Sequence, residues 1–196
     1  AVIPVNLNGI AADLDKIVQI ARKYDIKVIE DNAQGLGAYL DGKSTGTYGD
    51  FGTLSFFPAK NLGGIGDGGG ITTQTDENAE KIYRFRNHGR DENLEVRGWG
   101  VNSRLDNLQA AILSVKLRHL DAALERRREI AATYFSEFSK YEELKLPIDY
   151  RNDRRRKISY QNYELEVKDR DEFVEFLAEN GVATTKPWGG KAVHHF

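Results

Sequence analysis

The first 31 residues alternate between apolar and amphipathic stretches in an order that few folds accommodate. Residues 2–5 and 27–30 are short apolar runs typical of buried strands, and residues 13–24 carry apolar side chains at helical spacing. A strand, a helix and a strand of these lengths predict a β-α-β unit, in which the two strands lie parallel with a right-handed crossover. We therefore expect an α/β fold with a mostly parallel sheet.

Further strands and helices are predicted along the rest of the chain. Strands are expected at residues 53–57 and 70–75, and helices at residues 76–87, 105–125 and 129–143. The helix over 105–125 has such a broad apolar stripe that two of its sides must be buried, as at a domain or dimer interface.

The composition shifts around residue 147, and we expect a domain boundary there, with residues 1–146 in one part and residues 147–196 in another. Residues 153–157 (DRRRK) form a charged run, which is expected to be a solvated loop. A strand, a helix and a strand are then predicted at residues 160–167, 169–180 and 182–185.

The composition also argues against several classes of protein. The net charge of −2 argues against nucleic acid or an anionic membrane as the main partner. No run of eighteen apolar residues occurs, so no transmembrane helix is expected. Cysteine is absent, which excludes a disulfide framework, a thiolate catalyst and a cysteine-ligated metal cluster. We expect a cytoplasmic protein without a metal site.

Lys60 stands on a predicted turn between an apolar strand and a glycine run, in the sequence SFFPAKNLGG (residues 55–64). A lysine buried against a cofactor loses its charge easily and becomes a nucleophilic amine, as a Schiff base to pyridoxal phosphate requires. Asp31 follows an apolar strand at its carboxyl end, where α/β sheets place their ligands. A carboxylate there keeps the pyridine nitrogen of this cofactor protonated, which makes the ring an electron sink.

Two other side chains fit the same cofactor. Ser55, five residues before Lys60, is a candidate donor to the phosphate, and Gln34 is a candidate contact of the ring hydroxyl. Each residue also has an ordinary interpretation: Asp31 as a helix N-cap, Gln34 as a turn cap, Ser55 as a strand residue and Lys60 as a surface lysine. Their combination and order favour the cofactor.

The glycine run following Lys60 contains the G-x-G-x-x-G spacing of dinucleotide-binding loops, in GIGDGG (residues 64–69). That motif acts at a turn from a strand into a helix, whereas a strand is predicted to follow here. We therefore reject a dinucleotide site.

Four motifs together resemble the DegT/DnrJ/EryC1/StrS aminotransferases. They are IEDNAQ (29–34), SFFPAKNLG (55–63), GDGG (66–69) and GVNSRLDNLQAA (100–111). The resemblance covers nearly the whole chain. It implies aspartate-aminotransferase fold type I, pyridoxal 5′-phosphate as cofactor, and amination of a keto group on a nucleotide-linked sugar, usually with glutamate as donor.

The resemblance also assigns roles. Lys60 would be the aldimine lysine and Asp31 the pyridinium partner, while Gln34 and Ser55 would contact the cofactor. Asn102 resembles the asparagine that reaches the phosphate of the neighbouring subunit, which implies a homodimer with shared sites.

The resemblance further implies that the chain is a fragment. Residues 1–146 would be the C-terminal part of the large cofactor-binding domain with the interdomain helices, and residues 147–196 part of the small α/β domain. The family's N-terminal phosphate turn and ring-stacking aromatic residue have no counterpart here. The chain also departs from the family at Asn6, where a histidine is common, and at Asn32, where a small residue is usual.

The tail WGGKAVHHF (188–196) resembles members that aminate C3 of dTDP-3-keto-6-deoxyhexoses. His194 and His195 are therefore candidate sugar contacts, and a surface or core histidine pair is the alternative.

Two other functions remain open. A sugar dehydratase of the same family would typically replace the lysine by histidine or add a cysteine-bound iron–sulfur cluster, and neither feature occurs here. A non-catalytic, cofactor-binding regulator would keep both Lys60 and Asp31, so only activity separates it from an enzyme.

Overall fold

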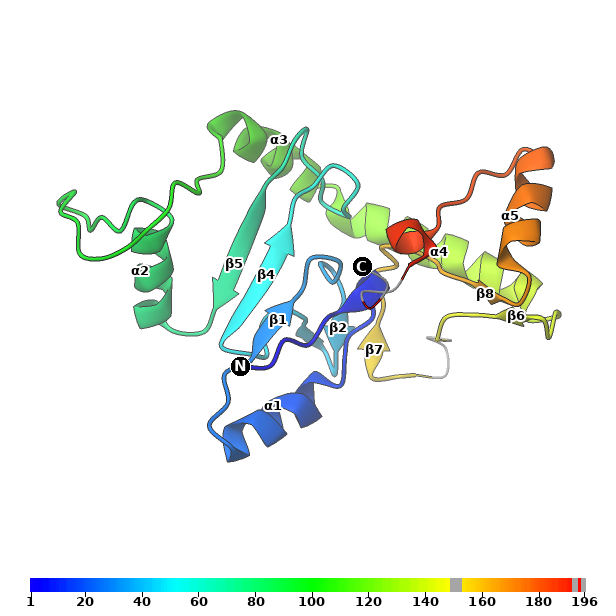
Figure 1. Ribbon diagram of the computed structural model, residues 1–196, viewed down its shortest axis with the longest axis horizontal. Coiled ribbons are helices and arrows are strands. Elements are labelled where there is room, and N and C mark those ends of the chain that lie inside the picture. The colour runs from blue at the N-terminus through cyan, green and yellow to red at the C-terminus, as the bar shows by residue number, and fades with distance from the viewer. Residues whose placement is uncertain (149–152, 192–193, 195–196) are drawn as a thin grey trace.

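The computed structural model describes residues 1–148, 153–191 and 194 as a mixed α/β protein, which confirms the predicted class (Figure 1). The helices are α1 (Leu14–Lys23), α2 (Asp76–Phe85), α3 (Asn107–Leu117), α4 (Leu120–Phe138) and α5 (Arg170–Glu179), with 3₁₀ turns at Leu7–Gly9 and Pro187–Gly190. The strands are β1 (Ile29–Asp31), β2 (Tyr39–Leu40), β3 (Lys43–Ser44), β4 (Phe51–Ser55), β5 (Gly69–Thr73), β6 (Leu144–Lys145), β7 (Arg156–Lys157) and β8 (Glu166–Val167).

The central sheet has the strand order β1-β4-β5. Strands β1 and β4 are parallel, and β5 runs antiparallel beside β4. Residues 2–5 lie along the other side of β1 through parallel bridges at Val2–Val28 and Val5–Asp31, although they do not form a regular strand. The predicted β-α-β unit is therefore confirmed, and the carboxyl ends of β1 and β4 meet at one edge of the sheet, toward α3 and α4 (Figure 1).

Helix α1 is stabilised because its apolar face packs into two small core clusters. Val18 and Ala21 pack with Val28, just before β1, and Leu14 packs with Leu40 of β2. The polar side chains of α1 face solvent, as expected for a helix that covers one side of a sheet. This packing fixes the position of β1 and of the residues that follow it.

Helices α3 and α4 share the core cluster nearest to the Lys60 turn. Leu113 of α3 and Leu120 and Leu124 of α4 pack against Leu62. The predicted division into helices over 105–125 and 129–143 was wrong, because the break falls between α3 and α4 at residues 118–119. The apolar spacing continues across this break, so the sequence pattern does not reveal it.

The β2–β3 hairpin was not predicted within the glycine-rich connection that follows β1. Its two-residue turn consists of Asp41 and Gly42, which both have positive φ angles of 49° and 78°. Aspartate followed by glycine is a strong signal for a hairpin turn of this type. The signal was therefore present, although the flanking strands have only two residues each.

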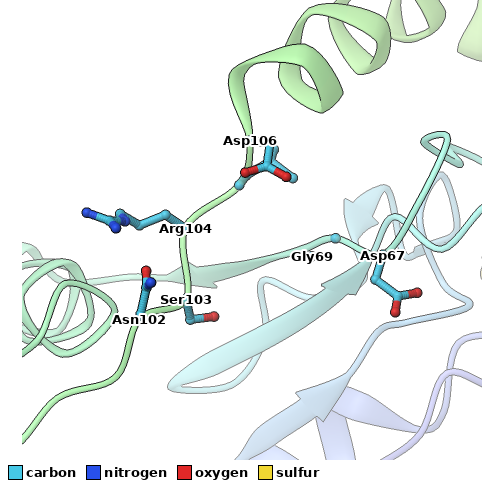
Figure 2. A pocket seen from close by; sticks show the side chains of 8 residues that line it. Asp67, Gly69, Asn102, Ser103, Arg104 and Asp106 are labelled. Atoms are coloured by element: carbon cyan, nitrogen blue, oxygen red, sulfur yellow. The ribbon is translucent and has the colours of Figure 1, made fainter.

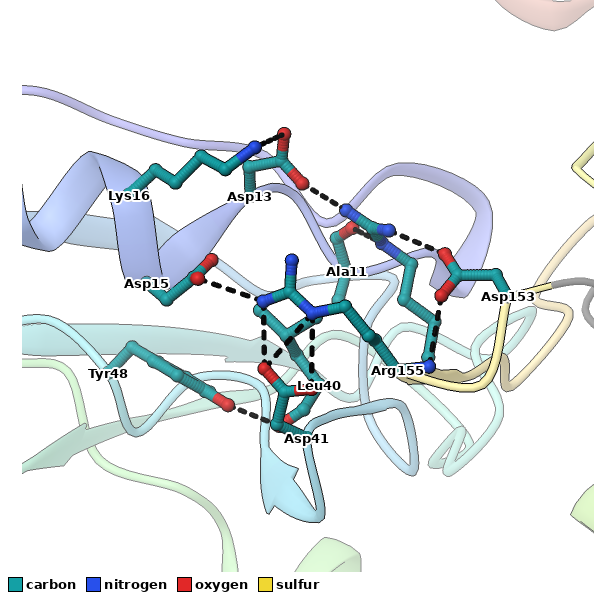
Figure 3. A network of polar contacts seen from close by, with 10 residues as sticks. Ala11, Asp13, Asp15, Lys16, Leu40, Asp41, Tyr48, Asp153 and Arg155 are labelled. Atoms are coloured by element: carbon teal, nitrogen blue, oxygen red, sulfur yellow. Dashed lines mark hydrogen bonds and ion pairs between the residues drawn. The ribbon is translucent and has the colours of Figure 1, made fainter.

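The predicted solvated loop over residues 153–157 was wrong. Strand β7 pairs with β2, and Arg155 and Arg156 join the two halves of the chain (Figure 3). Arg155 binds Asp41 with both Nε and Nη2, at 3.1 and 2.8 Å, and Nη2 also contacts Asp15 at 2.8 Å. Arg156 binds Asp13 and the carbonyl oxygen of Ala11. A local reading of the charged run missed these partners because they lie more than 100 residues away.

The ion pairs of Arg155 lead to a prediction about acid stability. Hydrogen bonds from Arg155 lower the pKa of Asp41 below its usual value of 3.8. Such a carboxylate stabilises the folded state above the unfolded pKa, and this contribution is lost as the pH falls through the folded pKa. We expect Arg155→Ala to lower the urea midpoint of the full-length protein at about pH 7, and we expect this effect to shrink as the pH falls below 3.8. An effect that persists undiminished in acid, or an equal effect of Arg154→Ala at its exposed neighbour, would contradict this account.

The last third of the chain contains β6, which pairs with β8, and the predicted helix that appears as α5. The predicted strand over 160–167 is present only at its end, as β8, and residues 182–185 form no strand. Residues 158–160 instead pack against α4, where Ile158 and Tyr160 form a cluster with Ala131. The division of the chain at residue 147 stays a prediction. Within the residues that the structure describes, no helix is long and apolar enough to cross a membrane.

Candidate active site

The site begins at the edge of the sheet where β1 and β4 end. Asp31 closes β1 and pairs in register with Thr53, two residues before Ser55 at the end of β4. The Oδ1 atom of Asp31 accepts a hydrogen bond from the N–H of Ala33 at 3.1 Å. No lysine or arginine in the described part of the chain pairs with this half-buried carboxylate. The Asp31 carboxylate can therefore accept a hydrogen bond from a ligand at this edge.

Lys60 lies on a tight turn directly after β4. The N–H of Lys60 donates to the carbonyl oxygen of Phe57 at 2.9 Å. A Cβ at Gly63 would overlap the carbonyl group of Pro58, so the turn closes only with glycine there. Lys60 is half-buried, and its Nζ has no hydrogen-bond or ion-pair partner among the described residues. The lysine therefore lies on a defined turn, and no described acidic side chain forms an ion pair with its amine.

Helix α3 holds the glycine run that follows Lys60. Gln109 accepts a hydrogen bond from the N–H of Ile65 at 2.9 Å, and the Nζ of Lys116 donates to the carbonyl oxygen of Gly63. Leu62 is buried in the cluster between α3 and α4. The glycine-rich composition of the run suggests a flexible loop. These contacts nevertheless fix its first half.

Asn61 leaves a buried acceptor beside the lysine. Its Nδ2 donates to the carbonyl oxygen of Leu36 at 3.3 Å, whereas its Oδ1 is buried without a hydrogen-bond partner in the described structure. Native proteins rarely leave such an atom unpaired unless a water or a ligand binds it. The unpaired oxygen therefore marks a place for a polar ligand next to Lys60.

Ser55 and Gln34 both lie at this edge, and both already make one hydrogen bond. The Oγ of Ser55 accepts from the N–H of Phe57 at 3.3 Å, which leaves its hydroxyl proton for another acceptor. The Oε1 of Gln34 accepts from the N–H of Asn8 at 2.7 Å, which leaves its amide N–H groups for a ligand. The predicted turn-capping role of Gln34 and a ligand contact are therefore compatible.

Asn102 instead lines a cavity of about 530 Å³ (Figure 2). The lining residues are Asp67, Gly68, Gly69, Asn102, Ser103, Arg104, Leu105 and Asp106. Asp31, Gln34, Ser55 and Lys60 do not line it. The cavity nevertheless adjoins the sheet edge described above, because Gly69, which lines the cavity, pairs with Ser55.

His194 is exposed, and His195 lies outside the described residues.

A buried carboxylate next to Asp31 was missed by the sequence reasoning. Glu30 is fully buried and accepts hydrogen bonds from the backbone N–H groups of Gly46, Tyr48 and Gly49 at 2.6, 2.5 and 2.9 Å. Backbone donors of this number can satisfy a buried carboxylate without a basic partner. Glu30 thereby fixes the strand from which Asp31 projects, and an acidic residue inside an apolar strand was the signal available in the sequence.

Asn6 and Asn32 belong to the same network as Glu30. The Nδ2 of Asn6 donates to Asn32 at 2.9 Å and to Glu30 at 3.3 Å. All three side chains are buried, so each asparagine supplies the polar partner that the other needs.

The chain is similar to known proteins along most of its length. It is 45% identical over 184 residues to the pleiotropic regulatory protein of Geobacillus stearothermophilus, covering 94% of this chain and 49% of that protein. It is 46% identical over 184 residues to the dTDP-3-amino-3,6-dideoxy-alpha-D-galactopyranose transaminase of Aneurinibacillus thermoaerophilus, covering 94% of this chain and 50% of that protein. The chain thus spans about half the length of the curated relatives it matches.

The chain is also similar to solved structures. The crystal structure of S. venezuelae DesV in complex with a ketimine intermediate superposes with a TM-score of 0.87 at 32% identity, over 97% of this chain and 53% of that one. This match confirms aspartate-aminotransferase fold type I. The model of the DegT/DnrJ/EryC1/StrS aminotransferase family matches residues 1–195. The chain therefore belongs to the DegT/DnrJ/EryC1/StrS aminotransferase family.

Proposed function

We propose that the full-length protein is a pyridoxal 5′-phosphate-dependent aminotransferase that places an amino group on a keto group of a nucleotide-linked sugar. The observation that carries this proposal is the placement of Lys60 and Asp31. An amine and a carboxylate, each without a charged partner in the described chain, follow the adjacent ends of two parallel strands. Membership of the aminotransferase family supports the same conclusion.

The residues present fit this cofactor. The carboxylate of Asp31 suits a protonated pyridine nitrogen, and the unpaired Oδ1 of Asn61 beside Lys60 supports binding of a polar group there. Ser55 would donate its hydroxyl proton to the phosphate, and Gln34 would present its amide N–H groups to the ring hydroxyl. When bound, the cofactor supplies an aldehyde and an electron-withdrawing ring.

The residues of the chain would act in sequence. The amine of Lys60 would be the group that holds the cofactor through its aldehyde. The same amine would also serve as the general base and acid that moves a proton at the reacting carbon of an amino-acid substrate. The Asp31 carboxylate would hold a protonated ring nitrogen, which would favour loss of the proton from the reacting carbon.

The amino donor and the sugar are the finer part of the proposal. We take glutamate as donor and C3 of a dTDP-3-keto-6-deoxyhexose as acceptor. The similar protein of Aneurinibacillus thermoaerophilus is a transaminase named for a dTDP-linked 3-amino-3,6-dideoxy sugar, which supports this choice. His194 and His195 are proposed as contacts of the sugar. Residues 1–146 and 147–196 are proposed as parts of the large and the small domain.

A homodimer with shared sites is proposed as the working form. Asn102 lines a cavity that Lys60 does not line and is exposed, as suits a residue that reaches the phosphate bound by a second subunit. Apolar side chains nearby also lack cover within this chain: Trp99 is 97% exposed and Leu108 is 67% exposed. A second subunit would remove such apolar surface from water.

Transfer of the amino group from glutamate tests the proposal. The full-length protein with bound pyridoxal 5′-phosphate should release 2-oxoglutarate from glutamate, in an amount equal to the bound cofactor when no sugar is present. A cofactor-binding regulator is the competing function, because the similar protein of Geobacillus stearothermophilus is named a regulatory protein. Release of no 2-oxoglutarate by protein that carries the cofactor on Lys60 would favour the regulator.

A further inference from the structure

The side chain of Gln161 spans the backbone on both sides of Lys60. Its Nε2 donates to the carbonyl oxygen of Ala59 at 2.8 Å, and its Oε1 accepts from the N–H of Asn61 at 2.9 Å. Gln161 is 100 residues further along the chain and is buried. A carboxamide has one acceptor and one donor face, and here each face bonds one of the peptide groups that flank the lysine.

Gln161 is itself held in place by its main chain. Its N–H donates to the carbonyl oxygen of Asn8 at 3.0 Å, and the Nη1 of Arg127 on α4 lies 3.4 Å from its carbonyl oxygen. Two residues earlier, the N–H of Ser159 donates to the carbonyl oxygen of Gly9. A Cβ at Gly9 would overlap Ser159, so only glycine permits this close approach. The Gln161 side chain therefore projects from a fixed backbone.

The Lys60 turn has no substitute for these two bonds within the described structure. The other bonds of the turn use different groups, namely the N–H of Lys60 with Phe57 and the Nδ2 of Asn61 with Leu36. Among the residues that the structure describes, the carbonyl group of Ala59 and the N–H of Asn61 bond only Gln161. Without its carboxamide, both peptide groups would lose their partner in a partly buried place, which favours rearrangement of the turn.

The segment that carries Gln161 is also linked to Gln34, at the other end of the site. The N–H of Asn8 donates to the Oε1 of Gln34, while the carbonyl oxygen of Asn8 accepts from the N–H of Gln161. One continuous set of hydrogen bonds therefore runs from Gln34 through Asn8 and Gln161 to the backbone around Lys60. The segment that carries Gln161 thus supports both the Gln34 side and the lysine side of the site.

We propose that Gln161 is a positioning residue that fixes the orientation of Lys60 by bonding both flanking peptide groups. The inference rests on the proposed function, in which the Lys60 amine must meet the aldehyde carbon of pyridoxal 5′-phosphate. A misplacement of about 1 Å at a reacting group can cost about 100-fold in rate. Gln161 would reduce such misplacement without touching the cofactor.

The test compares two variants of the full-length protein with a matched control. Gln161→Leu removes both bonds, and Gln161→Glu keeps the acceptor for Asn61 but loses the donor to Ala59. The control is Asn162→Ala, because Asn162 is the exposed neighbour and contacts only the Asn8 side chain among the described hydrogen bonds. Cofactor-free protein is mixed with pyridoxal 5′-phosphate and reduced with borohydride at intervals, and the label on Lys60 is measured by peptide mass. Amide hydrogen exchange at Asn61 is measured on the same samples.

We expect Gln161→Leu to slow attachment at Lys60 by about tenfold at an unchanged folded fraction, since positioning contributes through orientation. Exchange at Asn61 should become faster in Gln161→Leu and stay slow in Gln161→Glu, while Asn162→Ala should behave like the wild type. Unchanged attachment and unchanged exchange in Gln161→Leu would overturn the inference but not the proposed function. Failure of both Gln161 variants to fold would also overturn it, because Gln161 would then maintain the fold. A wild-type protein that shows no label on Lys60 would overturn both.

Discussion

Replacing Lys60 by alanine is expected to abolish both covalent binding of pyridoxal 5′-phosphate and turnover. The alanine variant loses the amine that bonds the cofactor and the amine that later moves the proton. One acid–base group contributes about 10²–10⁴-fold, so the loss of turnover should reach about 10⁴-fold or more when both tasks fail together. Turnover is measured as formation of 2-oxoglutarate from glutamate with a keto-sugar acceptor.

The fold should survive this substitution. Lys60 holds its turn through its backbone N–H, and its Nζ bonds no other described residue, so the thermal midpoint should change little. Lys157→Ala is the matched control, because Lys157 is an exposed lysine on β7, which pairs with the hairpin rather than with the central sheet. A Lys60→Ala protein that keeps turnover would contradict the assignment of the lysine.

Replacing Asp31 by asparagine is expected to leave the cofactor attached while slowing the chemistry. The asparagine has almost the same shape and can keep the hydrogen bond with the N–H of Ala33, but it no longer balances a positive ring nitrogen. Loss of one partner of a desolvated ion pair costs about 3–5 kcal/mol. This corresponds to a rate of amine transfer lower by about 10²- to 5 × 10³-fold.

Two measurements on the same Asp31→Asn sample check this result. The borohydride label on Lys60 should stay close to the wild-type amount, and the rate of 2-oxoglutarate formation should fall. Asp76→Asn, at an exposed aspartate in the first turn of α2, is the control for loss of one negative charge. Wild-type rates in Asp31→Asn would show that this carboxylate does not serve the ring nitrogen.

The sequence predicts the parts of the fold and site that depend on local pattern. The apolar runs and the amphipathic helix before Asp31 gave the parallel β-α-β unit, and the glycine run after Lys60 leads into a strand as expected. Lys60, Asp31, Ser55 and Gln34 lie near one sheet edge because parallel strands end together. Their individual roles toward the cofactor stay predictions.

The remaining features depend on contacts between distant residues, which one sequence does not reveal. Arg155 finds Asp41 more than 100 residues away, and Gln161 finds the backbone beside Lys60 at a similar separation. The network of Glu30 is of the same kind, because its donors are backbone groups of a later loop. A backbone N–H has no identity in the sequence, so a residue that recognises one cannot be found from residue types alone.

The central claim is that Lys60 carries the cofactor, and reductive labelling of the full-length protein tests it most directly. The protein is saturated with pyridoxal 5′-phosphate, reduced with borohydride and digested, and the modified peptide is located by mass. The account predicts one pyridoxyl group per chain, on the peptide that contains Lys60, and none in Lys60→Ala. A label on another lysine, or no label on any peptide, would contradict it.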